Sequence, residues 1–182
     1  MAPRALYTPR PACARIVVAR SFFEGGGFCT DIADCRTRSA GYLGSTAADG
    51  PTVALTDPYF DLNGTLNPLL SRFNHVYVRY CDGGYYSGDR ANPVPSANAS
   101  ANASAPPLYF RGRHISEALL ADLAAKHSLG AATDVVIAGC SAGGIRTYAH
   151  IDALKALLPK AARVVGFADS GFYLDLDIFV RW

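Results

Sequence analysis

The chain has 182 residues, the usual size of one domain and enough to bury a hydrophobic core. Hydrophobic residues make up 50% of the sequence and charged residues 18%, so the composition is typical of a globular protein and excludes a disordered one. The formal net charge of +2 is too small to indicate binding to nucleic acid or to an anionic membrane surface. No apolar run approaches the length of a membrane-spanning helix.

The N-terminal part predicts one strand followed by a glycine loop. Residues 1–14 contain three prolines and are predicted to be an irregular lead-in to a domain that covers residues 15–182. Residues 14–23 are rich in β-branched and aromatic side chains, which favours a strand. Three glycines follow within residues 24–29, and such a backbone can turn sharply and present its N–H groups outward. A plain flexible loop is the alternative interpretation.

The middle of the chain is dominated by turn residues. Glycine, proline and Asn-Gly or Asp-Pro pairs interrupt residues 30–74 too often for a long helix, and such an excursion is typical of a functional or covering loop. Residues 75–80 alternate between apolar and polar side chains, which predicts a second strand. Residues 81–89 end this strand and form an aromatic loop. Residues 91–107 are a low-complexity run of alanine, asparagine, serine and proline, so we expect a disordered surface insertion.

The C-terminal half alternates helices with short apolar strands. A helix is predicted over residues 112–129 with Gly130 as its stop, and strands over residues 134–138 and 163–168. Between these strands, residues 145–158 predict a helix. Its expected apolar face consists of Ile145, Tyr148, Ile151, Leu154 and Leu158.

This alternation predicts an α/β fold with a mostly parallel sheet and helices on both faces. Ligand sites in such sheets lie at the carboxyl ends of the strands. Three loops of unusual composition, residues 24–29, 81–89 and 139–144, follow predicted strands, and residues 169–175 form a fourth. We therefore expect these loops to meet at one site.

Residues 139–144 read GCSAGG, between an apolar strand and a helical pattern. This is the context in which G-x-S-x-G forms a nucleophile elbow, which would expose the hydroxyl of Ser141 on a strained turn. A small-residue turn of no catalytic role is the alternative, because the bare motif is common by chance. A phosphate loop and a dinucleotide-binding turn are disfavoured, since neither GK[ST] nor G-x-G-x-x-G is present.

The cysteines and glycosylation sequons favour an oxidising compartment. Cys29 and Cys35 are close enough in the sequence to form a local disulfide. The chain has five cysteines, so at least one is free or has its partner elsewhere. Acceptor sequons begin at Asn63, Asn98 and Asn102, although such triplets also arise by chance. The first residues lack the apolar core of a signal peptide, so we expect a missing N-terminus.

Five blocks in order carry a resemblance to a known family. They are residues 24–29 (EGGGFC), 79–83 (RYCDG, with SG at 87–88), 110–112 (FRG), 139–144 (GCSAGG) and 169–175 (DSGFYLD). Together they resemble the pectin acetylesterase family, which also includes the animal carboxylesterase Notum. The resemblance implies an α/β-hydrolase fold and a serine esterase that needs no metal or cofactor.

Residue by residue, the resemblance assigns Ser141 as the nucleophile. The backbone N–H groups of Gly26, Gly27 and Ala142 match the oxyanion hole, the set of donors that stabilises the tetrahedral intermediate. The expected walls of the substrate site are Phe28, Asp82, Tyr85 and Asp169. Phe28 stands where the family usually has tryptophan, which keeps an aromatic ring but removes an indole donor. The expected disulfide is Cys29–Cys35, Cys81 is expected to pair with an N-terminal cysteine such as Cys13, and Cys140 is expected to be buried and free.

A serine nucleophile needs a histidine base and an orienting acid, which follow the serine in this fold. No histidine is among the residues after Ser141 except His150, which we expect to point away from the turn from its position in the helix. Surface or core-edge roles are expected for His75, His114 and His127. We therefore expect the N-terminal part of a larger enzyme, poorly soluble and with negligible esterase activity by itself.

The resemblance implies a secreted or cell-wall enzyme that removes acetyl groups from the polysaccharide pectin. Two alternatives stay open: a Notum-like carboxylesterase that removes an acyl group from a protein, and a truncated product without catalytic activity. The first alternative requires a deep apolar cavity, whereas an acetyl group requires a shallow one within a polar groove.

Overall fold

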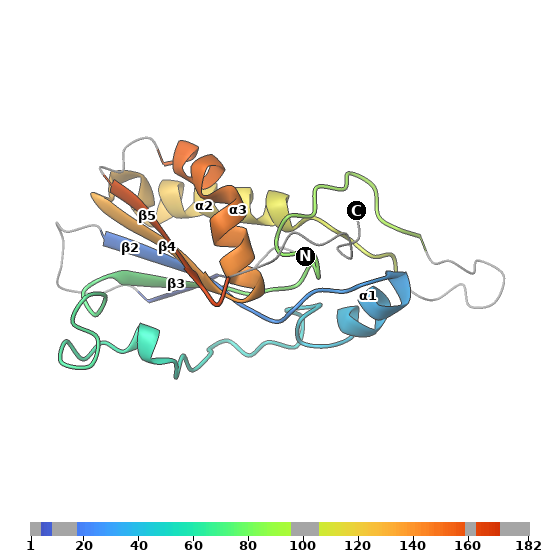
Figure 1. Ribbon diagram of the computed structural model, residues 1–182, viewed down its shortest axis with the longest axis horizontal. Coiled ribbons are helices and arrows are strands. Elements are labelled where there is room, and N and C mark those ends of the chain that lie inside the picture. Colours follow the sequence, from blue (N-terminus) through green and yellow to red (C-terminus); the bar gives the residue numbers. More distant parts are fainter. Residues whose placement is uncertain (1–4, 9–17, 96–105, 159–162, 172–182) are drawn as a thin grey trace.

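The computed structural model describes residues 5–8, 18–95, 106–158 and 163–171. Within them, one sheet has the strand order β1-β3-β2-β4-β5 (Figure 1). The strands are β1 (Ala5–Thr8), β2 (Val18–Phe23), β3 (Asn74–Val78), β4 (Asp134–Cys140) and β5 (Arg163–Asp169). β2, β3, β4 and β5 are parallel to one another, and β1 is antiparallel to β3. The prediction of a mostly parallel sheet is confirmed.

Strand β1 corrects the expectation of an irregular lead-in. Ala5 pairs with Val78 and Thr8 with His75, so β1 covers the outer edge of β3. The prolines at positions 3, 9 and 11 flank these four residues and do not interrupt them. A strand this short carries too little periodicity to be recognised among turn residues.

The predicted strand and helix of the nucleophile motif are confirmed, each with slightly different bounds. β4 buries both of its faces: Val135 and Ile137 pack in the main core, and Val136 and Ala138 pack on the opposite side of the sheet. A strand covered on both faces reads as a continuous apolar run, which explains the sequence pattern. Helix α3 (Ala142–Ala156) follows β4 after the single residue Ser141.

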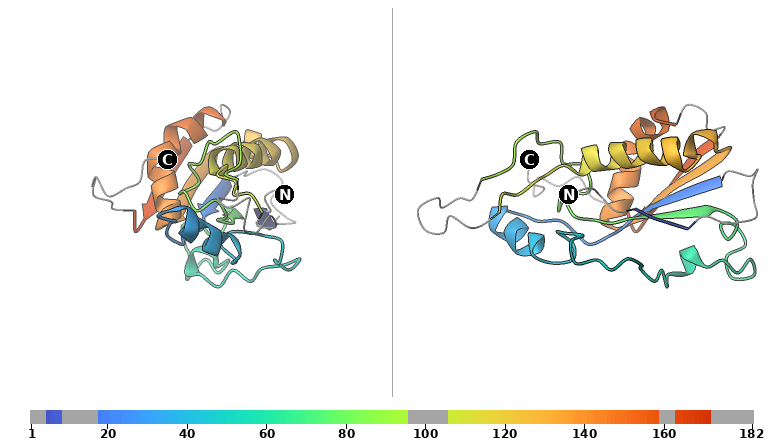
Figure 2. Two further views of the ribbon diagram at one scale, coloured as in Figure 1. Left: turned by 90° about the vertical axis from the view of Figure 1, so that its right-hand side faces the viewer. Right: turned by 180° about the vertical axis from the view of Figure 1, so that it is seen from behind.

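Helices α2 (Gly112–Lys126) and α3 cover the same face of the sheet, as Figures 1 and 2 show. Leu120 of α2 and Leu154 of α3 meet Ile137 of β4 in the main core. The expected apolar face of α3 is wrong at one position, because Tyr148 is 80% exposed. Arg146 and Thr147 are buried there instead.

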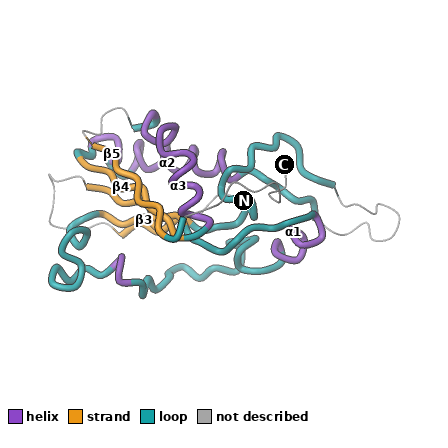
Figure 3. The backbone as a smooth tube through the Cα atoms, in the orientation of Figure 1, coloured by secondary structure: helices purple, strands orange, loops and turns teal. Residues whose placement is uncertain are grey.

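The opposite face of the sheet is covered by the long loop before β3, drawn in teal in Figure 3. Its short 3-10 helix η1 (Pro58–Phe60) places Phe60 against Phe22 of β2, with ring centroids 5.3 Å apart. The loop is therefore a covering loop, as its turn-rich composition predicts. On the same face β5 exposes Val165 and Phe167 by about half.

Helix α1 (Ile32–Ser39) was not predicted within this loop-rich region. Asp31 caps its N-terminus, because the Asp31 carboxylate accepts a hydrogen bond from the Asp34 N–H at 2.8 Å. Two basic residues lie in the last turn, where they favour the negative end of the helix dipole. The helix is short and mostly polar, with Cys35 as its buried residue, so the sequence shows no apolar stripe.

Two further boundaries differ from the sequence prediction. Helix α2 ends at Lys126, and the left-handed residue that terminates it is Ser128, with φ of 59°, while Gly130 lies inside the 3-10 helix η2 (Leu129–Ala131). Val94 and Leu108 exchange two backbone hydrogen bonds of 2.9 and 3.1 Å at the base of the insertion. The expected disorder is therefore wrong for these flanks, and residues 96–105 lie outside the described part of the chain.

Candidate functional site

Ser141 connects β4 to α3 with an unusual backbone conformation. Its φ and ψ angles are 52° and −115°, a strained region for a residue with a side chain. The Ser141 N–H donates to the Asp169 carbonyl at 3.0 Å, and its own carbonyl accepts from the Ile145 N–H at 3.0 Å. The next strand and the first turn of α3 thus hold the turn on both sides.

The glycines of the motif are required by close backbone approach. A Cβ atom at Gly139 would overlap the backbone of Gly143, and one at Gly143 would lie 2.6 Å from the Phe23 carbonyl carbon. A Cβ atom at Gly144 would lie 2.6 Å from the Asp169 carbonyl oxygen. The strand, the turn and the helix can pass one another only because these residues lack side chains.

The glycine loop after β2 lies directly against Ser141. A Cβ atom added to Gly25 would be 2.8 Å from the Cys140 carbonyl oxygen and 3.3 Å from the Ser141 Cβ. Gly26 and Gly27 have φ angles of +140° and +67°, which residues with side chains rarely adopt. Ala142 is the first residue of α3, so its N–H belongs to the helix terminus, where intrahelical partners are lacking.

Glu24 fixes the beginning of this loop, a role that the sequence alone did not reveal. Its carboxylate pairs with Arg79 at 2.8 Å and accepts the Tyr80 N–H at 2.8 Å. The hydroxyl of Tyr86 donates to the carbonyl oxygens of Glu24 and Val78, each at 3.0 Å. The ends of β2 and β3 are therefore joined by buried polar contacts just before the glycines.

Asp82 is placed differently from the expected substrate wall. Its side chain is 6% exposed, and both carboxylate oxygens accept backbone N–H groups. The donors are Gly84 and Tyr86 at 3.1 Å, Gly112 at 3.0 Å and Gly88 at 3.3 Å. Burial raises the pKa of Asp82 and these N–H groups act against that rise. A carboxylate with its lone pairs occupied holds the 82–88 turn and has little capacity left for a substrate.

Of the other expected wall residues, Phe28 and Tyr85 contact each other, and Asp169 contacts the elbow. The rings of Phe28 and Tyr85 lie 4.8 Å apart between centroids, so the aromatic residues of two loops meet. The Asp169 carboxylate accepts the Tyr59 hydroxyl at 3.0 Å, and the Asp169 carbonyl accepts the Ser141 N–H. Of the fourth loop only residues 169–171 are described, so the remainder, with Asp175, lies outside the described residues.

The described contacts of three histidines lead elsewhere than Ser141. His150 contacts the Ser87 hydroxyl at 2.8 Å, His75 contacts the Leu70 carbonyl at 2.9 Å, and His114 contacts the Asp89 carboxylate at 2.7 Å. His127 caps the C-terminus of α2, which precedes β4, whereas Ser141 follows β4 at its other end. The positions of His114 and His127 agree with the expected surface and core-edge roles, whereas His75 is buried, at 2% exposed.

His150 should make the protein less stable as the pH falls. Burial, with the positive charges of Arg146 and Arg113, lowers the pKa of His150 from 6.5 to about 4, while Glu117 acts in the opposite sense. Between these values the unfolded chain binds a proton that the folded chain does not, so stability is lost as the pH falls through this window. The urea concentration at the unfolding midpoint should therefore be lower at pH 5 than at pH 7. The difference between the two pH values should be smaller in His150→Gln. An equal difference in the two proteins would contradict this assignment.

The disulfide between Cys29 and Cys35 is confirmed, and it joins the glycine loop to α1. Cys140 is partly exposed beside Ser141, and burial together with the Asp169 charge raises the pKa of its thiol. Burial likewise raises the pKa of Cys81 to about 11. Cys13 lies outside the described residues, so its pairing with Cys81 stays a prediction.

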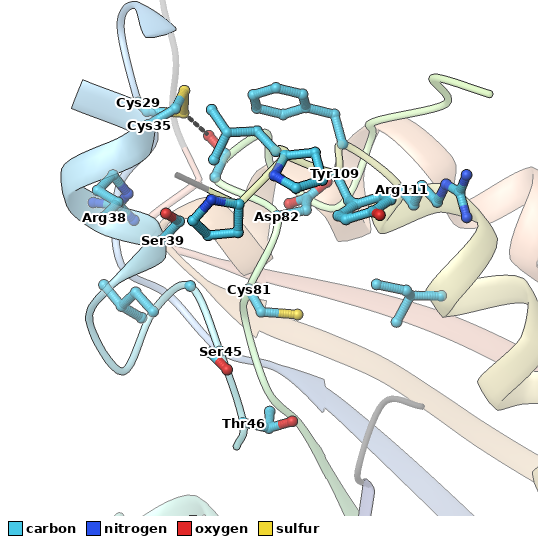
Figure 4. Close-up of a pocket in the computed structure, with 18 of the residues that line it drawn as sticks. Cys29, Cys35, Arg38, Ser39, Ser45, Thr46, Cys81, Asp82, Tyr109 and Arg111 are labelled. Atoms are coloured by element: carbon cyan, nitrogen blue, oxygen red, sulfur yellow. Dashed lines mark hydrogen bonds between the residues drawn. A yellow bond between two sulfur atoms is a disulfide. The ribbon is translucent and has the colours of Figure 1, made fainter. Parts of the chain in front are cut away.

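Two cavities lie near these loops. A cavity of 300 Å³ on the sheet face that carries Phe60 is lined by Gly25 and Cys140, the neighbours of Ser141. A larger one of 790 Å³ opens between α1 and the start of α2, with Arg38 and Arg111 on its two sides (Figure 4). Among the described residues, no group of three acidic, cysteine or histidine side chains is placed to hold a metal ion. In the same residues, no helix combines the length and apolarity needed to cross a membrane.

Comparison with known proteins places this site in a family. Pectin acetylesterase 11 of Arabidopsis thaliana is 34% identical over 157 residues, which are 83% of this chain and 36% of the relative. The human palmitoleoyl-protein carboxylesterase NOTUM is 27% identical over 159 residues, which are 85% of this chain and 30% of the relative. The chain therefore spans about a third of the length of these curated relatives.

A crystal structure of the Wnt deacylase Notum from Drosophila shares the fold. The TM-score is 0.78 at 24% sequence identity, over 94% of this chain and 48% of that one. The predicted α/β-hydrolase-like fold is thereby confirmed. A family model described as Pectinacetylesterase matches residues 17–180, which is most of the sequence. The chain belongs to the pectinacetylesterase family.

Proposed function

We propose that this chain carries the nucleophile and the oxyanion hole of a carboxylic ester hydrolase that removes acetyl groups from pectin. The observation that carries the proposal is the contact of Gly25 with Ser141. It brings the loop with Gly26 and Gly27 next to the strained serine and the first N–H of α3. Such an arrangement suits acyl transfer, because fixed N–H donors beside a nucleophile stabilise a tetrahedral oxyanion.

In the proposed reaction the Ser141 hydroxyl attacks the carbonyl carbon of an acetyl ester. The negative charge that develops on the carbonyl oxygen is bound by the N–H groups of Gly26, Gly27 and Ala142. The tetrahedral intermediate expels the sugar hydroxyl and leaves an acetyl group on Ser141, which water then removes. A base must take the serine proton, and the described contacts of His75, His114 and His150 lead elsewhere.

The choice of an acetylated polysaccharide over an acylated protein rests on similarity. Identity to pectin acetylesterase 11 is 34%, whereas identity to the human carboxylesterase NOTUM is 27%. A cavity of 300 Å³ beside the elbow, lined by Gly25 and Cys140, is a second observation that supports a small acyl group. The Cys29–Cys35 disulfide and the exposed sequon residue Asn63 support a secreted protein.

Acetate release from acetylated galacturonan tests the proposal, with and without free imidazole as an added base. We expect little release from the folded chain alone and about a tenfold or larger rise with imidazole, because a general base contributes roughly 10²- to 10⁴-fold when well placed. Ser141→Ala should reduce the release to that of imidazole without protein. This variant is the matched control, since imidazole itself cleaves esters slowly.

Each other outcome has a definite meaning. Release without imidazole that disappears in Ser141→Ala would support the ester hydrolase and show that the chain supplies its own base. A folded protein without any Ser141-dependent release, with or without imidazole, would refute the proposed activity and favour the non-catalytic alternative. Release from an acylated peptide but not from acetylated galacturonan would favour the protein substrate.

A further inference from the structure

We propose that Arg38 is a positioning residue that orients the Gly26–Gly27 peptide and so completes the oxyanion hole. This inference rests on the proposed function, because it concerns the same N–H donors. Arg38 belongs to α1, outside every block of the family resemblance. One of its guanidinium nitrogens, Nη2, donates to the Gly26 carbonyl oxygen at 2.6 Å.

Peptide planarity converts this contact into control of an N–H group. The Gly26 carbonyl and the Gly27 N–H belong to one trans peptide, so they point in opposite directions. A guanidinium that holds the carbonyl therefore directs the N–H to the other side of the loop. The hydrogen bond from a charged donor is also stronger than one between neutral groups. It polarises the peptide and makes the Gly27 N–H a better donor.

The surroundings of the loop agree with this direction. On one side, a Cβ atom at Gly26 would meet Leu43 at 2.8 Å and Tyr80 at 3.3 Å. The Arg38 guanidinium lies on the same Tyr80 ring, 5.9 Å from its centroid. The preceding residue of the loop, Gly25, lies against Ser141. The loop therefore contacts the surroundings of Arg38 through Gly26 and the nucleophile through Gly25.

Glycine makes this external support necessary. Gly26 and Gly27 have positive φ angles, and as glycines they have no side chain that would limit rotation of the backbone. A peptide between two such residues can rotate easily, and a rotated peptide would present its carbonyl oxygen to the oxyanion. Arg38 opposes this rotation, because it would break the contact with the Gly26 carbonyl.

The disulfide fixes the helix that carries Arg38. Cys35 lies three residues before Arg38 in α1, on the same side of the helix, and is bonded to Cys29 at the end of the glycine loop. Figure 4 shows Arg38 and the two cysteines together on the α1 side of the larger cavity. The disulfide therefore ties the end of the glycine loop to the helix that carries Arg38.

The test compares Arg38→Met with Arg36→Met, which removes the other arginine of the same helix. Arg36 donates to the Pro95 and Pro106 carbonyls, away from the glycine loop. The backbone ¹⁵N order parameter measured by NMR on labelled protein reports on the Gly27 N–H without any need for turnover. We expect the order parameter of Gly27 to fall from about 0.85, the value of rigid backbone, to below about 0.6 in Arg38→Met and to change little in Arg36→Met.

Ester cleavage supplies the second readout. In the imidazole-assisted assay, Arg38→Met should lower the maximal rate of acetate release by about 10- to 100-fold, a part of the 10²- to 10³-fold that one lost donor costs. The half-saturating substrate concentration should change little, and Arg38→Lys should recover part of the rate. A general loss of folding would instead lower the unfolding midpoint and affect Arg38→Lys equally.

The two proposals fail in different ways. An unchanged Gly27 order parameter in a folded Arg38→Met protein would overturn the role of Arg38, whatever the enzyme assay gives. A lowered order parameter in Arg38→Met, with no Ser141-dependent acetate release in the unsubstituted protein, would support the orienting contact and refute the ester hydrolase. A rate loss that appears only as a higher half-saturating concentration would overturn the oxyanion role.

Discussion

Asp82→Asn should lower the free energy of unfolding by about 3 kcal/mol, because buried N–H groups lose their acceptors. The carboxylate accepts four backbone N–H groups, from Gly84, Tyr86, Gly88 and Gly112. An asparagine amide offers one oxygen, and its NH₂ group would face donors that it cannot bond. Urea unfolding at pH 7 measures the loss.

A matched control lies at the exposed end of the same loop. Asp89 has a side chain 47% exposed and pairs with Arg113 and His114 on the surface. Asp89→Asn should cost at most about 1 kcal/mol, because exposed ion pairs contribute little. Equal losses in the two variants would contradict the role that we assign to Asp82.

Arg146 extends this prediction to a pair of buried charges. Its side chain is 2% exposed, and burial lowers its pKa to about 10 although the Asp82 charge acts against this. The Nε atom of Arg146 has no hydrogen-bond partner among the described residues, and its guanidinium lies 5.9 Å from the Phe23 ring centroid. Removing the Asp82 charge would take away the largest of the negative charges that favour this cation, which is costly in a protein interior.

A double-mutant cycle separates the two effects. Arg146→Met should cost stability by itself, because it removes a buried side chain and its charge interaction with Asp82. The double variant with Asp82→Asn should lose less than the sum of the two single variants, with a coupling of about 0.5 kcal/mol or more, because the two opposite charges act on each other in the protein interior. Strict additivity would show that the two charges do not sense each other.

The strands and helices with a clear pattern of apolar residues could be predicted from the sequence. Elements that depend on a few polar contacts, a disulfide or long-range pairing were missed. β4 was recognisable because burial on both faces produces a continuous apolar run. Helix α1 was missed because an aspartate cap and a disulfide specify it in place of an apolar stripe. β1 was missed because its pairing with β3 is long-range and its own pattern covers four residues.

In the candidate site, the close backbone approach at the glycines and the tight turn at Ser141 could be predicted, and the side chains that hold this backbone could not. The motif around Ser141 reflects backbone approach, which only glycine permits, and that requirement is visible in the sequence. Asp82 was assigned to the substrate wall because its position in an aromatic loop does not reveal which N–H groups its carboxylate will accept. Arg38 was overlooked because a side chain that holds a distant carbonyl leaves no local pattern.

Gly143→Ala should have the largest effect of any single methyl addition in the motif. The added Cβ would overlap the Phe23 carbonyl oxygen and lie 2.6 Å from its carbon, and neither backbone atom can move without displacing β2. Overpacking of a core costs about 1–3 kcal/mol and more where rigid backbone is involved, so we expect a loss of about 3 kcal/mol or failure to fold. Soluble yield and the urea midpoint measure it.

Two other glycines separate the causes of this loss. An alanine Cβ at Gly41 would meet nothing closer than the Arg38 carbonyl oxygen at 3.5 Å, so Gly41→Ala should leave stability within about 1 kcal/mol of the unsubstituted protein. A Cβ at Gly27 has no neighbour within 4 Å, but its φ angle of +67° is unfavourable for alanine by about 1–2 kcal/mol. The expected order of destabilisation is therefore Gly41, then Gly27, then Gly143. If Gly143→Ala were no worse than Gly27→Ala, backbone conformation alone would explain the motif, and the close approach of α3 to β2 would not be needed to hold Ser141 in its strained turn.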